Sequence, residues 1–265
     1  MTGSTSTLIR YQGPVAATTY TLSLIGQGFS FDGDDVTGGR ITGLDLVIGG
    51  TTYARIRGLD LSAERFDDLA VPGFTNGQIL ERFLLGGRDV IAGTGAADRI
   101  NGYAGSDRLV GGNGTDDLDG GTGNDTLAGG GTFDYLVGGA GNDRLSGGQG
   151  NDDLTGNGGK DRFIFDVSVF QNGSDSIADF SRRDDVLVFD NDAYRGIGRA
   201  GDLANSKFKN VDTGTLDAND RFFYSQTSGA LFYDADGSGF ARSAVLIAVF
   251  ENNIRLTADD FLIVN

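Results

Sequence analysis

A repeat of nine residues fills the middle of the chain, from residue 84 to residue 164. Two representative copies are GGTGNDTLA at 120–128 and GGAGNDRLS at 138–146. Position six is Asp and position eight is a large apolar residue in all nine copies, while Gly fills position one in eight copies and position four in seven. A fixed period this short predicts a solenoid, in which every unit packs mainly against its neighbours.

Two sets of residues define the repeat. The position-six aspartates are Asp89, Asp98, Asp107, Asp116, Asp125, Asp134, Asp143, Asp152 and Asp161. The position-eight apolar residues are Ile91, Ile100, Leu109, Leu118, Leu127, Leu136, Leu145, Leu154 and Phe163. A flexible Gly-rich linker is the alternative interpretation, but a linker does not keep Asp and an apolar residue in register nine times.

The two parts of each unit favour different backbone structures. Positions one to five are rich in Gly, which adopts the left-handed angles that tight turns require. Positions seven to nine suit a very short strand with one side chain pointing inward. Because one inward side chain cannot form a core alone, two strands per coil must face each other. The sequence therefore predicts parallel strands stacked in coils of two units, or eighteen residues.

The aspartates predict rows of cation sites. A carboxylate has no place in an apolar core, so we expect each Asp to lie at an edge of the coil. Units two apart share an edge, with their turns about 4.8 Å apart. Each gap then holds two carboxylates and several backbone carbonyls, an oxygen-only ligand set that favours Ca²⁺. The seven expected pairs are Asp89 with Asp107, Asp98 with Asp116, Asp107 with Asp125, Asp116 with Asp134, Asp125 with Asp143, Asp134 with Asp152 and Asp143 with Asp161.

Composition excludes several classes of function. The chain has a net charge of −16, which opposes binding to nucleic acid or anionic membranes and attracts divalent cations. It contains no His and no Cys, so zinc sites built on these residues, disulfides and thiol chemistry are absent. No apolar stretch approaches the roughly 18 residues of a membrane span. No signal peptide of the Sec type is visible at the N-terminus.

Residues 1–83 predict a small antiparallel β unit followed by helices. Strands are expected at 20–26, 28–33, 40–49 and 52–61, where apolar and polar residues alternate or the run ends in Gly. Ser62 predicts the cap of a short helix that ends before Pro72, and Thr75 predicts the start of a second helix that reaches residue 84. We expect the second helix to cover the first coil of the solenoid, with an ordinary surface helix as the alternative.

Residues 165–265 predict a β-rich cap. Apolar and polar residues alternate over 220–250, which indicates strands joined by tight turns. Asp234 and Asp236 match the start of an EF-hand loop, but its twelfth position is Val245 and not Glu. A hairpin turn is therefore the preferred interpretation, and a minor cation site is the alternative. The chain ends in LTADDFLIVN, where acidic residues precede a terminal apolar run. This segment resembles a type I secretion signal, so residues 165–265 are expected to include a secretion-signal region. A final strand that closes the sheet is the other interpretation, and both can hold.

The nine units resemble the RTX (repeats-in-toxin) nonapeptide, G-G-x-G-x-D-x-U-x, over about a third of the chain. The resemblance implies an all-β fold, with a parallel β-roll at 84–164 between a small β unit at 1–83 and a β-rich cap at 165–265. It also implies that backbone carbonyls complete each Ca²⁺ site. For the Asp107–Asp125 pair these are the carbonyls of Tyr103, Gly105, Gly120 and Thr122. The glycines assigned to Ca²⁺ binding are Gly87, Gly102, Gly105, Gly111, Gly114, Gly120, Gly123, Gly129, Gly138, Gly141, Gly147, Gly150 and Gly156.

The sequence departs from the repeat at a few positions. Ala96 and Thr132 replace Gly at position four, and Leu84 replaces it at position one. A β-branched Thr132 fits poorly where a positive φ is required, so we expect the Asp134–Asp152 site to be the weakest. Beyond the repeats, residues 173–180 resemble the continuation of RTX rolls in secreted metalloproteases. This implies Asp175 as a further Ca²⁺ ligand, with a polar turn residue as the alternative, and leaves Asp179 open.

The resemblance also bears on function. RTX proteases need His ligands, RTX lipases need Gly-x-Ser-x-Gly and a His, and haemolysins need long apolar helices before the repeats; none occurs here. We therefore expect a protein without catalytic residues, with a hydrolase that uses only carboxylates as the enzymatic alternative. The resemblance implies export by a type I secretion exporter and folding on Ca²⁺ outside the bacterial cell. The expected role is structural or adhesive, as a homo-oligomer or surface assembly; the alternative is an accessory module whose residues 1–83 bind a glycan or another ligand.

The outward positions seven and nine predict two different faces of the roll. One sheet presents mostly polar and acidic residues, among them Asp117, Asp119 and Asp153. The other sheet presents small and apolar residues beside Arg108, Arg144 and Arg162. We expect the second face to be covered by the C-terminal region or by a neighbouring copy, because small residues allow close approach. Two solvated faces are the alternative.

Overall fold

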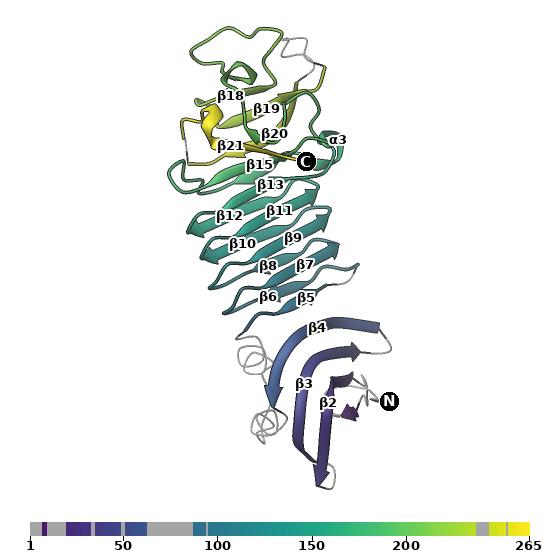
Figure 1. The fold of residues 1–265 in the computed structure, drawn as a ribbon. Coiled ribbons are helices and arrows are strands. Elements are labelled where there is room, and N and C mark those ends of the chain that lie inside the picture. The colour runs from purple at the N-terminus through teal and green to yellow at the C-terminus, as the bar shows by residue number, and fades with distance from the viewer. Residues whose placement is uncertain are drawn as a thin grey trace.

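Two long β-sheets run through the structure. The computed structural model describes residues 7–9, 20–32, 35–48, 51–62, 87–93, 95–236, 244–252 and 254–265. Sheet A has 12 strands and sheet B has nine. In Figure 1 the strands of a central roll lie stacked between a curved N-terminal unit and a C-terminal cap. The described chain is nearly all β, which confirms the predicted fold class of a parallel β-roll with two β-rich flanks.

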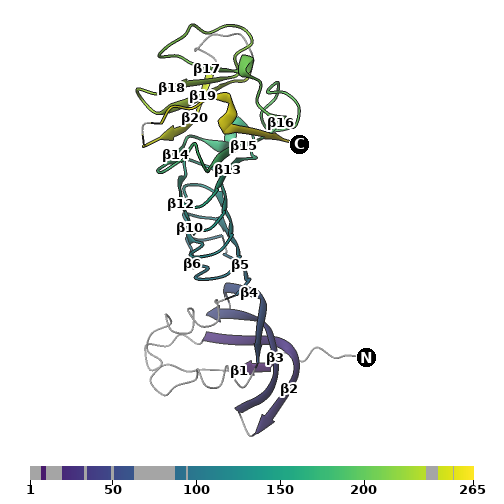
Figure 2. The ribbon, with the colours of Figure 1, turned by 60° about the vertical axis from the view of Figure 1, so that its left-hand side comes forward.

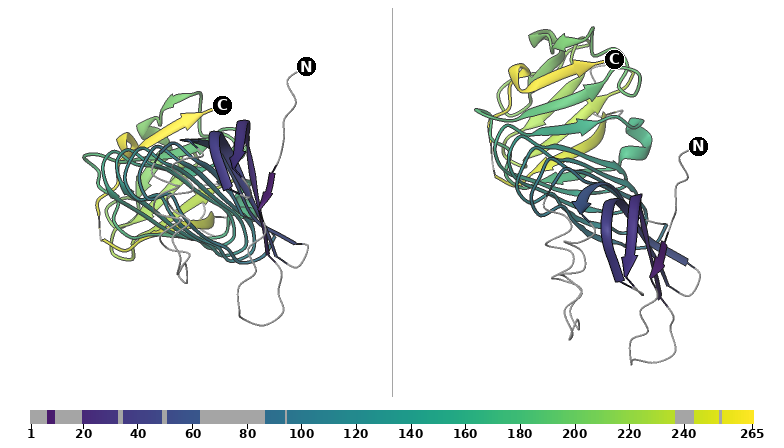
Figure 3. Two further views of the ribbon diagram at one scale, coloured as in Figure 1. Left: turned by 90° about the horizontal axis from the view of Figure 1, so that it is seen from below. Right: turned by 60° about the horizontal axis from the view of Figure 1, so that its bottom comes forward.

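The strands of the roll alternate between the two sheets. In sheet A they are β5 (Val90–Ala92), β7 (Arg108–Asn113), β9 (Thr126–Gly131), β11 (Arg144–Gln149) and β13 (Arg162–Phe165). In sheet B they are β6 (Arg99–Asn101), β8 (Asp117–Asp119), β10 (Tyr135–Ala140) and β12 (Asp153–Gly158). Neighbours pair in parallel with a register of one coil, so that Leu109 lies beside Leu127 and Leu136 beside Leu154. Figure 3 shows these coils following one another along the roll, and the predicted eighteen-residue coil is confirmed.

Most of the strands are longer than the sequence predicted. The strands β7, β9, β10, β11 and β12 each have six residues and continue through positions one to three of the next unit. The turn is therefore confined to positions four to six. Position one is also buried, as Gly111 is, but Gly has no side chain, so each unit adds one inward apolar side chain as expected. The Gly-rich positions can extend because Gly112 pairs with Gly130 of the next coil.

The core of the roll is a double ladder of apolar side chains. Leu109, Leu118, Leu127, Leu136, Leu145 and Leu154 are all at most 1% exposed. Each such side chain contributes about 1.5–3 kcal/mol when it is fully buried. One large apolar side chain per nine residues is a thin core. Other interactions between the coils must therefore matter to the stability of the roll.

The N-terminal strands extend sheet A beyond the first coil. They are β1 (Thr7–Ile9), β2 (Tyr20–Asp32), β3 (Asp35–Ile48) and β4 (Thr51–Ser62), all paired antiparallel. The two strands expected at 20–26 and 28–33 are one continuous strand, β2. The strand β4 pairs antiparallel with β5, so the curved unit below the roll in Figure 2 continues the same sheet. The helices expected after Ser62 and Thr75 lie outside the described residues.

The C-terminal cap continues both sheets. Its elements are α3 (Val169–Asn172), β14 (Asp175–Ile177), β15 (Val186–Asp190), β16 (Gly201–Asp202), η1 (Asn205–Lys207), β17 (Phe208–Asn210), β18 (Phe222–Ser225), β19 (Ala230–Asp234), β20 (Ala244–Phe250), η2 (Ala258–Asp260) and β21 (Phe261–Val264). The strand β14 pairs in parallel with β12, and β15 pairs in parallel with β13. Strands are expected over 220–250, and β18, β19 and β20 lie there and pair antiparallel. The expected final strand is β21, which lies parallel to β15, while β16 forms the edge of sheet A beyond it. The loop after Asp236 falls on 237–243, outside the described residues.

The complete order of strands shows how the flanks join the roll. Sheet A runs β1-β2-β3-β4-β5-β7-β9-β11-β13-β15-β21-β16. Sheet B runs β17-β18-β19-β20-β14-β12-β10-β8-β6. Neither sheet is interrupted at residue 165, where the sequence places a boundary.

The C-terminal region reaches the sheet A face at its cap end, where the Ser146 hydroxyl donates to Asp166 Oδ1 at 3.0 Å. Val110, Ala128 and Ser146 on sheet A are half-buried, and so are Asp119, Val137 and Thr155 on sheet B. The strands β14 and β15 continue the strand pairing along the roll, so these strands of the cap lie beyond the last coil. Coverage by a neighbouring copy stays a prediction.

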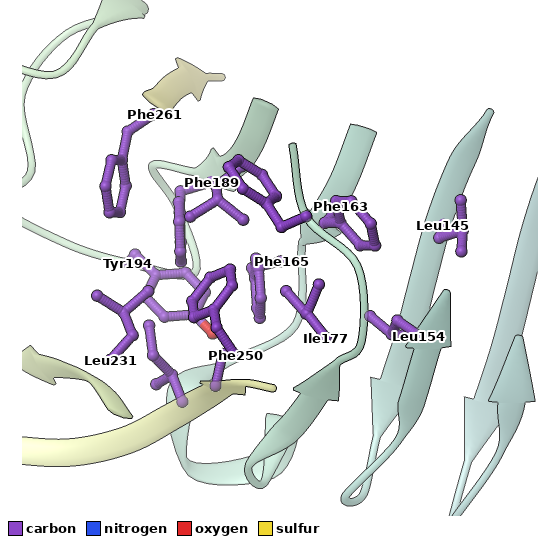
Figure 4. Packing of buried hydrophobic residues seen from close by; sticks show 14 of the residues in the cluster. Leu145, Leu154, Phe163, Phe165, Ile177, Phe189, Tyr194, Leu231, Phe250 and Phe261 are labelled. Carbon is purple, nitrogen blue, oxygen red and sulfur yellow. The ribbon is translucent and has the colours of Figure 1, made fainter. Parts of the chain in front are cut away.

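Aromatic side chains close the C-terminal end of the apolar ladder. Phe165 and Phe189 stack with ring centres 4.6 Å apart, and Tyr194 meets Phe189 edge-on at 5.0 Å. Figure 4 shows these rings continuing the line of Leu145 and Leu154 into the cap. Phe163, Phe165 and Phe189 are fully buried. The larger rings fill a wider space than the roll offers, so the cap supplies the thick core that the roll lacks.

Replacing Phe189 by Ala is expected to lower the free energy of unfolding by about 3–5 kcal/mol, the usual cost of removing a buried aromatic ring. Phe189 packs against Phe165, Tyr194, Phe222 and Phe261, which cannot all collapse into the space left behind. Urea unfolding at saturating Ca²⁺ measures the change. Phe170→Ala is the control, because that ring is 78% exposed and its loss should cost little. Equal losses in the two variants would contradict the assignment of the core.

Candidate metal centres

Hydrogen bonds join the aspartates of successive coils. One carboxylate oxygen, Oδ1, of each Asp accepts the backbone N–H of the Asp one coil earlier. The distance is 2.7 Å from the Asp89 nitrogen to Asp107 Oδ1 and 2.8 Å from the Asp125 nitrogen to Asp143 Oδ1. The same bond links Asp98 to Asp116, Asp107 to Asp125, Asp116 to Asp134, Asp134 to Asp152 and Asp143 to Asp161. The structure thus brings together all seven predicted pairs.

The second carboxylate oxygen, Oδ2, is buried without a hydrogen-bond partner. This holds for Asp89, Asp107, Asp116, Asp125, Asp134, Asp143, Asp152 and Asp161. The side chains of these residues are at most 2% exposed. The carboxylates are buried in the turns against the position-one glycines and outside the Leu ladder, which agrees with the expected position at an edge of the coil. A buried ionised oxygen without a partner costs several kcal/mol, so this row of oxygens fits a bound cation.

Glycine at position one makes room for the unpaired oxygen. A Cβ atom placed on Gly120 would lie 2.5 Å from the carbonyl oxygen of Gly138 and 2.7 Å from Asp125 Oδ2. The equivalent atom on Gly102 would lie 2.7 Å from the Gly120 oxygen and 2.8 Å from Asp107 Oδ2. A carbonyl oxygen and a carboxylate oxygen therefore lie close to the same point in each coil. This is the oxygen-rich environment that Ca²⁺ prefers.

The turn backbone orients the other carbonyls. Positions two and four have positive φ, as Gly121 (+88°) and Gly123 (+134°) show. Across the Asp107–Asp125 pair, the Tyr103 carbonyl accepts the Thr122 N–H at 2.9 Å, and the Thr122 carbonyl accepts the Gly105 N–H at 2.8 Å. Two of the four carbonyls implied by the RTX resemblance are thus already joined between coils. A carbonyl oxygen has two lone pairs, so one that accepts a hydrogen bond can also coordinate a cation.

Burial and the repulsion between neighbouring carboxylates raise the pKa values of the repeat aspartates. Burial raises the pKa of Asp125 to about 7, and the neighbouring charges of Asp143 and Asp107 add to the increase. Burial likewise raises the pKa of Asp152 and of Asp161 to about 7, with contributions from Asp134 and Asp185 respectively. Carboxylates one coil apart therefore affect one another, as the pairing requires. A divalent cation between them would offset both causes.

The Asp rows continue into the cap beyond the last repeat. Asp175 Oδ1 accepts the Asp152 N–H at 3.1 Å, which continues the row along sheet B. Asp185 Oδ1 accepts the Asp161 N–H at 2.9 Å, which continues the row along sheet A. The sequence analysis found Asp175 and missed Asp185, because the intervals grow to 23 and 24 residues and break the period. Leu187 follows Asp185 by two residues, and this position-six to position-eight spacing was the available signal.

Asp179 has a different environment. Its Oδ1 accepts the Gly156 N–H at 2.9 Å, and its Oδ2 accepts the Asn157 N–H at 2.7 Å. Both oxygens therefore hold the last turn of the roll against the cap. In the part of the chain that the structure describes, no three acidic side chains gather into a group able to hold a metal. Any cation in the roll must take backbone oxygens as well as the paired Asp.

The backbone of Thr132 is strained in its turn. Its φ is +75°, a left-handed angle that a β-branched residue tolerates poorly, and most other position-four residues with positive φ are Gly. The bond between the Asp134 N–H and Asp152 Oδ1 is nevertheless kept, at 2.9 Å.

Thr132→Gly is therefore expected to stabilise the Ca²⁺-loaded protein by about 1 kcal/mol. The midpoint of urea unfolding measures it. Asn157→Gly is the control with a smaller gain, since Asn tolerates its φ of +62°; a lower midpoint for Thr132→Gly would contradict the strain.

A known protein family matches the repeats of this chain. The family described as "RTX calcium-binding nonapeptide repeat (4 copies)" matches residues 85–118, 92–127, 110–132 and 128–163. No curated protein matches the chain. Among the described residues, no helix is long and apolar enough to cross a membrane.

Two solved structures are similar to parts of the chain. One is the AlgE6R3 subunit of the Azotobacter vinelandii mannuronan C5-epimerase, with 24% identity and a TM-score of 0.20 over 66% of this chain and 77% of that one. The other is the extracellular lipase LipA from Serratia marcescens, with 18% identity and a TM-score of 0.23. That match covers 67% of this chain and only 38% of the lipase.

Proposed function

Because residues 85–163 are RTX calcium-binding nonapeptide repeats folded as a β-roll, we propose that this chain is an extracellular bacterial protein that folds when it binds Ca²⁺. The observation that carries the proposal is the row of eight buried Oδ2 atoms without partners. Such a row is unfavourable in a metal-free protein and favourable around cations. Folding and calcium binding are therefore one event.

We assign seven Ca²⁺ sites to the roll, one for each Asp pair between successive coils. Each site takes the carboxylates of its pair together with backbone carbonyls of the two turns, mainly those of the glycines at positions one and four. The hydrogen bonds between paired Asp and the proximity of Asp125 Oδ2 and the Gly138 carbonyl to the Gly120 backbone support this ligand set. Two carboxylates per cation, with flexible Gly-rich turns, suit Ca²⁺ better than the smaller Mg²⁺.

We propose that the protein reaches the outside of the cell through a type I secretion exporter. The exporter requires an unfolded chain, and a roll that depends on Ca²⁺ meets this requirement in the calcium-poor cytosol. Extracellular calcium modules typically bind with dissociation constants on the order of 10⁻⁴–10⁻³ M. Calcium outside the cell would then drive folding after export.

We propose a structural role at the cell surface and no catalysis. RTX repeats are generally not catalytic. The chain contains no His, and the eight buried Asp residues of the roll are those assigned to Ca²⁺. A rigid roll with two flat outer faces suits adhesion or self-assembly.

Calcium stoichiometry tests the assignment of the sites. Asp125 accepts the Asp107 N–H and donates its own N–H to Asp143, so it belongs to two gaps. Asp89 donates to Asp107 and lies at the start of the row, so it belongs to one. Asp125→Ala should therefore lose two Ca²⁺ per chain and Asp89→Ala one, measured by equilibrium dialysis with metal analysis on the full chain. Equal losses would rule out the stacked pairs, and a chain that binds no Ca²⁺ would rule out the proposed function.

A further inference from the structure

The sheet A face of the roll carries a column of exposed arginines. Position seven of successive sheet A strands holds Arg108, Thr126, Arg144 and Arg162, aligned by the strand pairing. The three arginines are exposed, and among the described residues none of them forms an ion pair. The neighbouring column at position nine is small or apolar and half-buried; it consists of Val110, Ala128, Ser146 and Ile164. We call these two columns face A.

The sheet B face is complementary in charge. Its position-seven column holds Arg99, Asp117, Tyr135 and Asp153. Tyr135 is 47% exposed and stands between the two aspartates, supported edge-on by Phe133. Arg99 forms an ion pair with Asp117 at 3.2 Å, but its side chain is 88% exposed, and such pairs contribute little. We call the column from Arg99 to Asp153 face B.

Face B becomes more acidic toward the cap. Glu251 adds a carboxylate at the cap end of this column, next to the strand pair of Asp153 and Ser176. Ser176, the residue next to Asp153 in the column, donates its hydroxyl to Glu251 at 2.7 Å. Like charges held together on a surface are relieved by a cationic partner.

The spacings of the two faces match. Arg108 and Arg144 are separated by two strand steps, about 9.6 Å, and so are Asp117 and Asp153. The match is enforced by the fold, because both sheets share one coil. Between the charges stand the small Thr126 on face A and the exposed Tyr135 on face B. The arginines of face A can therefore pair with the aspartates of face B while the Tyr135 ring covers Thr126. A buried aromatic residue surrounded by polar pairs is typical of protein–protein interfaces.

We infer that the Ca²⁺-loaded protein assembles by stacking face A of one copy on face B of the next. The two sheets lie on opposite sides of the roll, as β6, β10 and β12 against β5 show in Figure 2. The contact therefore leaves a free face at each end and continues into an open row. The inference rests on the proposed function, since both faces exist only when calcium has folded the roll, and it names the surfaces of the proposed assembly.

Paired charge reversals test this contact in the full chain. One variant carries Arg108→Glu and Arg144→Glu; the other carries Asp117→Arg and Asp153→Arg. Each variant alone opposes like charges and should sediment as a monomer in 5 mM Ca²⁺, a concentration chosen to be about fivefold above the weakest expected dissociation constant. A mixture of the two variants restores opposite charges at every contact and should form rows again. Arg183→Glu with Arg199→Glu is the control, because these exposed cap residues change the net charge equally and should leave assembly intact.

Analytical ultracentrifugation and circular dichroism on the same samples separate the possible outcomes. Wild-type rows that dissolve in EGTA or at high salt, with rescue by mixing, support the inference. A folded wild-type protein that stays monomeric in Ca²⁺ overturns the inference and leaves the proposed function standing. If the variant with Arg108→Glu and Arg144→Glu assembles without its partner variant, face A is excluded as the contact. The wild-type protein could stay monomeric and sediment faster only when polygalacturonate is added, with the effect lost in the variant with Arg108→Glu and Arg144→Glu. That result would overturn the contact between copies and would assign face A to binding an acidic polymer.

Discussion

Removing calcium with EGTA is expected to abolish the β structure of residues 84–164, and millimolar Ca²⁺ is expected to restore it. In the folded roll, eight carboxylate oxygens are buried without a partner. Burial raises the pKa of Asp89 and of Asp134 to about 6, and that of Asp125 to about 7, so the ionised carboxylates are disfavoured in these gaps without a cation. Burying one apolar side chain per nine residues stabilises the roll by less than the entropy cost of ordering its Gly-rich backbone. Metal must therefore supply the difference.

Circular dichroism during a calcium titration checks this transition. Half of the change should occur at a free Ca²⁺ concentration on the order of 10⁻⁴–10⁻³ M. Magnesium is the control: it demands tight octahedral geometry and holds its water, so the same concentration should restore little β signal. A β spectrum unchanged by EGTA would show that the roll folds without metal.

Gly123→Ala is expected to be the most damaging single substitution in the turns. Gly123 has a φ of +134°, and a Cβ atom there would lie 1.3 Å from the carbonyl oxygen of Gly105 in the preceding coil. An overlap of that size cannot be relieved by rotating a side chain, because both partners are backbone. The two coils must separate, which disturbs the Asp107–Asp125 and Asp125–Asp143 pairs together. We expect a loss of more than about 3 kcal/mol and of two bound Ca²⁺, on the scale of a severe steric defect.

Gly158→Ala is the matched control. It lies at position three of the last unit, its φ is not left-handed, and no atom lies within 4 Å of a Cβ placed there. The exchange should leave stability within about 0.5 kcal/mol of wild type, as is usual for open surface positions. Urea midpoints and calcium stoichiometry of the two variants give the comparison. Wild-type stability in Gly123→Ala would show that the coils are not stacked as closely as described.

The sequence alone determined the roll and its chemistry. A strict period with Asp at position six and an apolar residue at position eight allows only one repeating coil, and the observed pairing of Leu109 with Leu127 has that period. The same period predicts which aspartates meet, and the bond from Asp125 to Asp143 joins one of the expected pairs. Local repetition suffices here because each unit contacts copies of itself, so the long-range contacts follow from the short-range pattern.

The tertiary structure decided what the period could not. The extension of the strands through position three and the burial of the Asp side chains depend on how neighbouring coils pair, as in Gly112 with Gly130. Asp185 joins the row although it breaks the period, because β15 pairs with β13 and carries its preceding turn into line. The strand β4 joins the first coil antiparallel, and the cap adds its strands to both sheets. These contacts form between segments with different sequences, so they depend on the shape and hydrogen-bonding edges of the finished roll, which no single repeat contains.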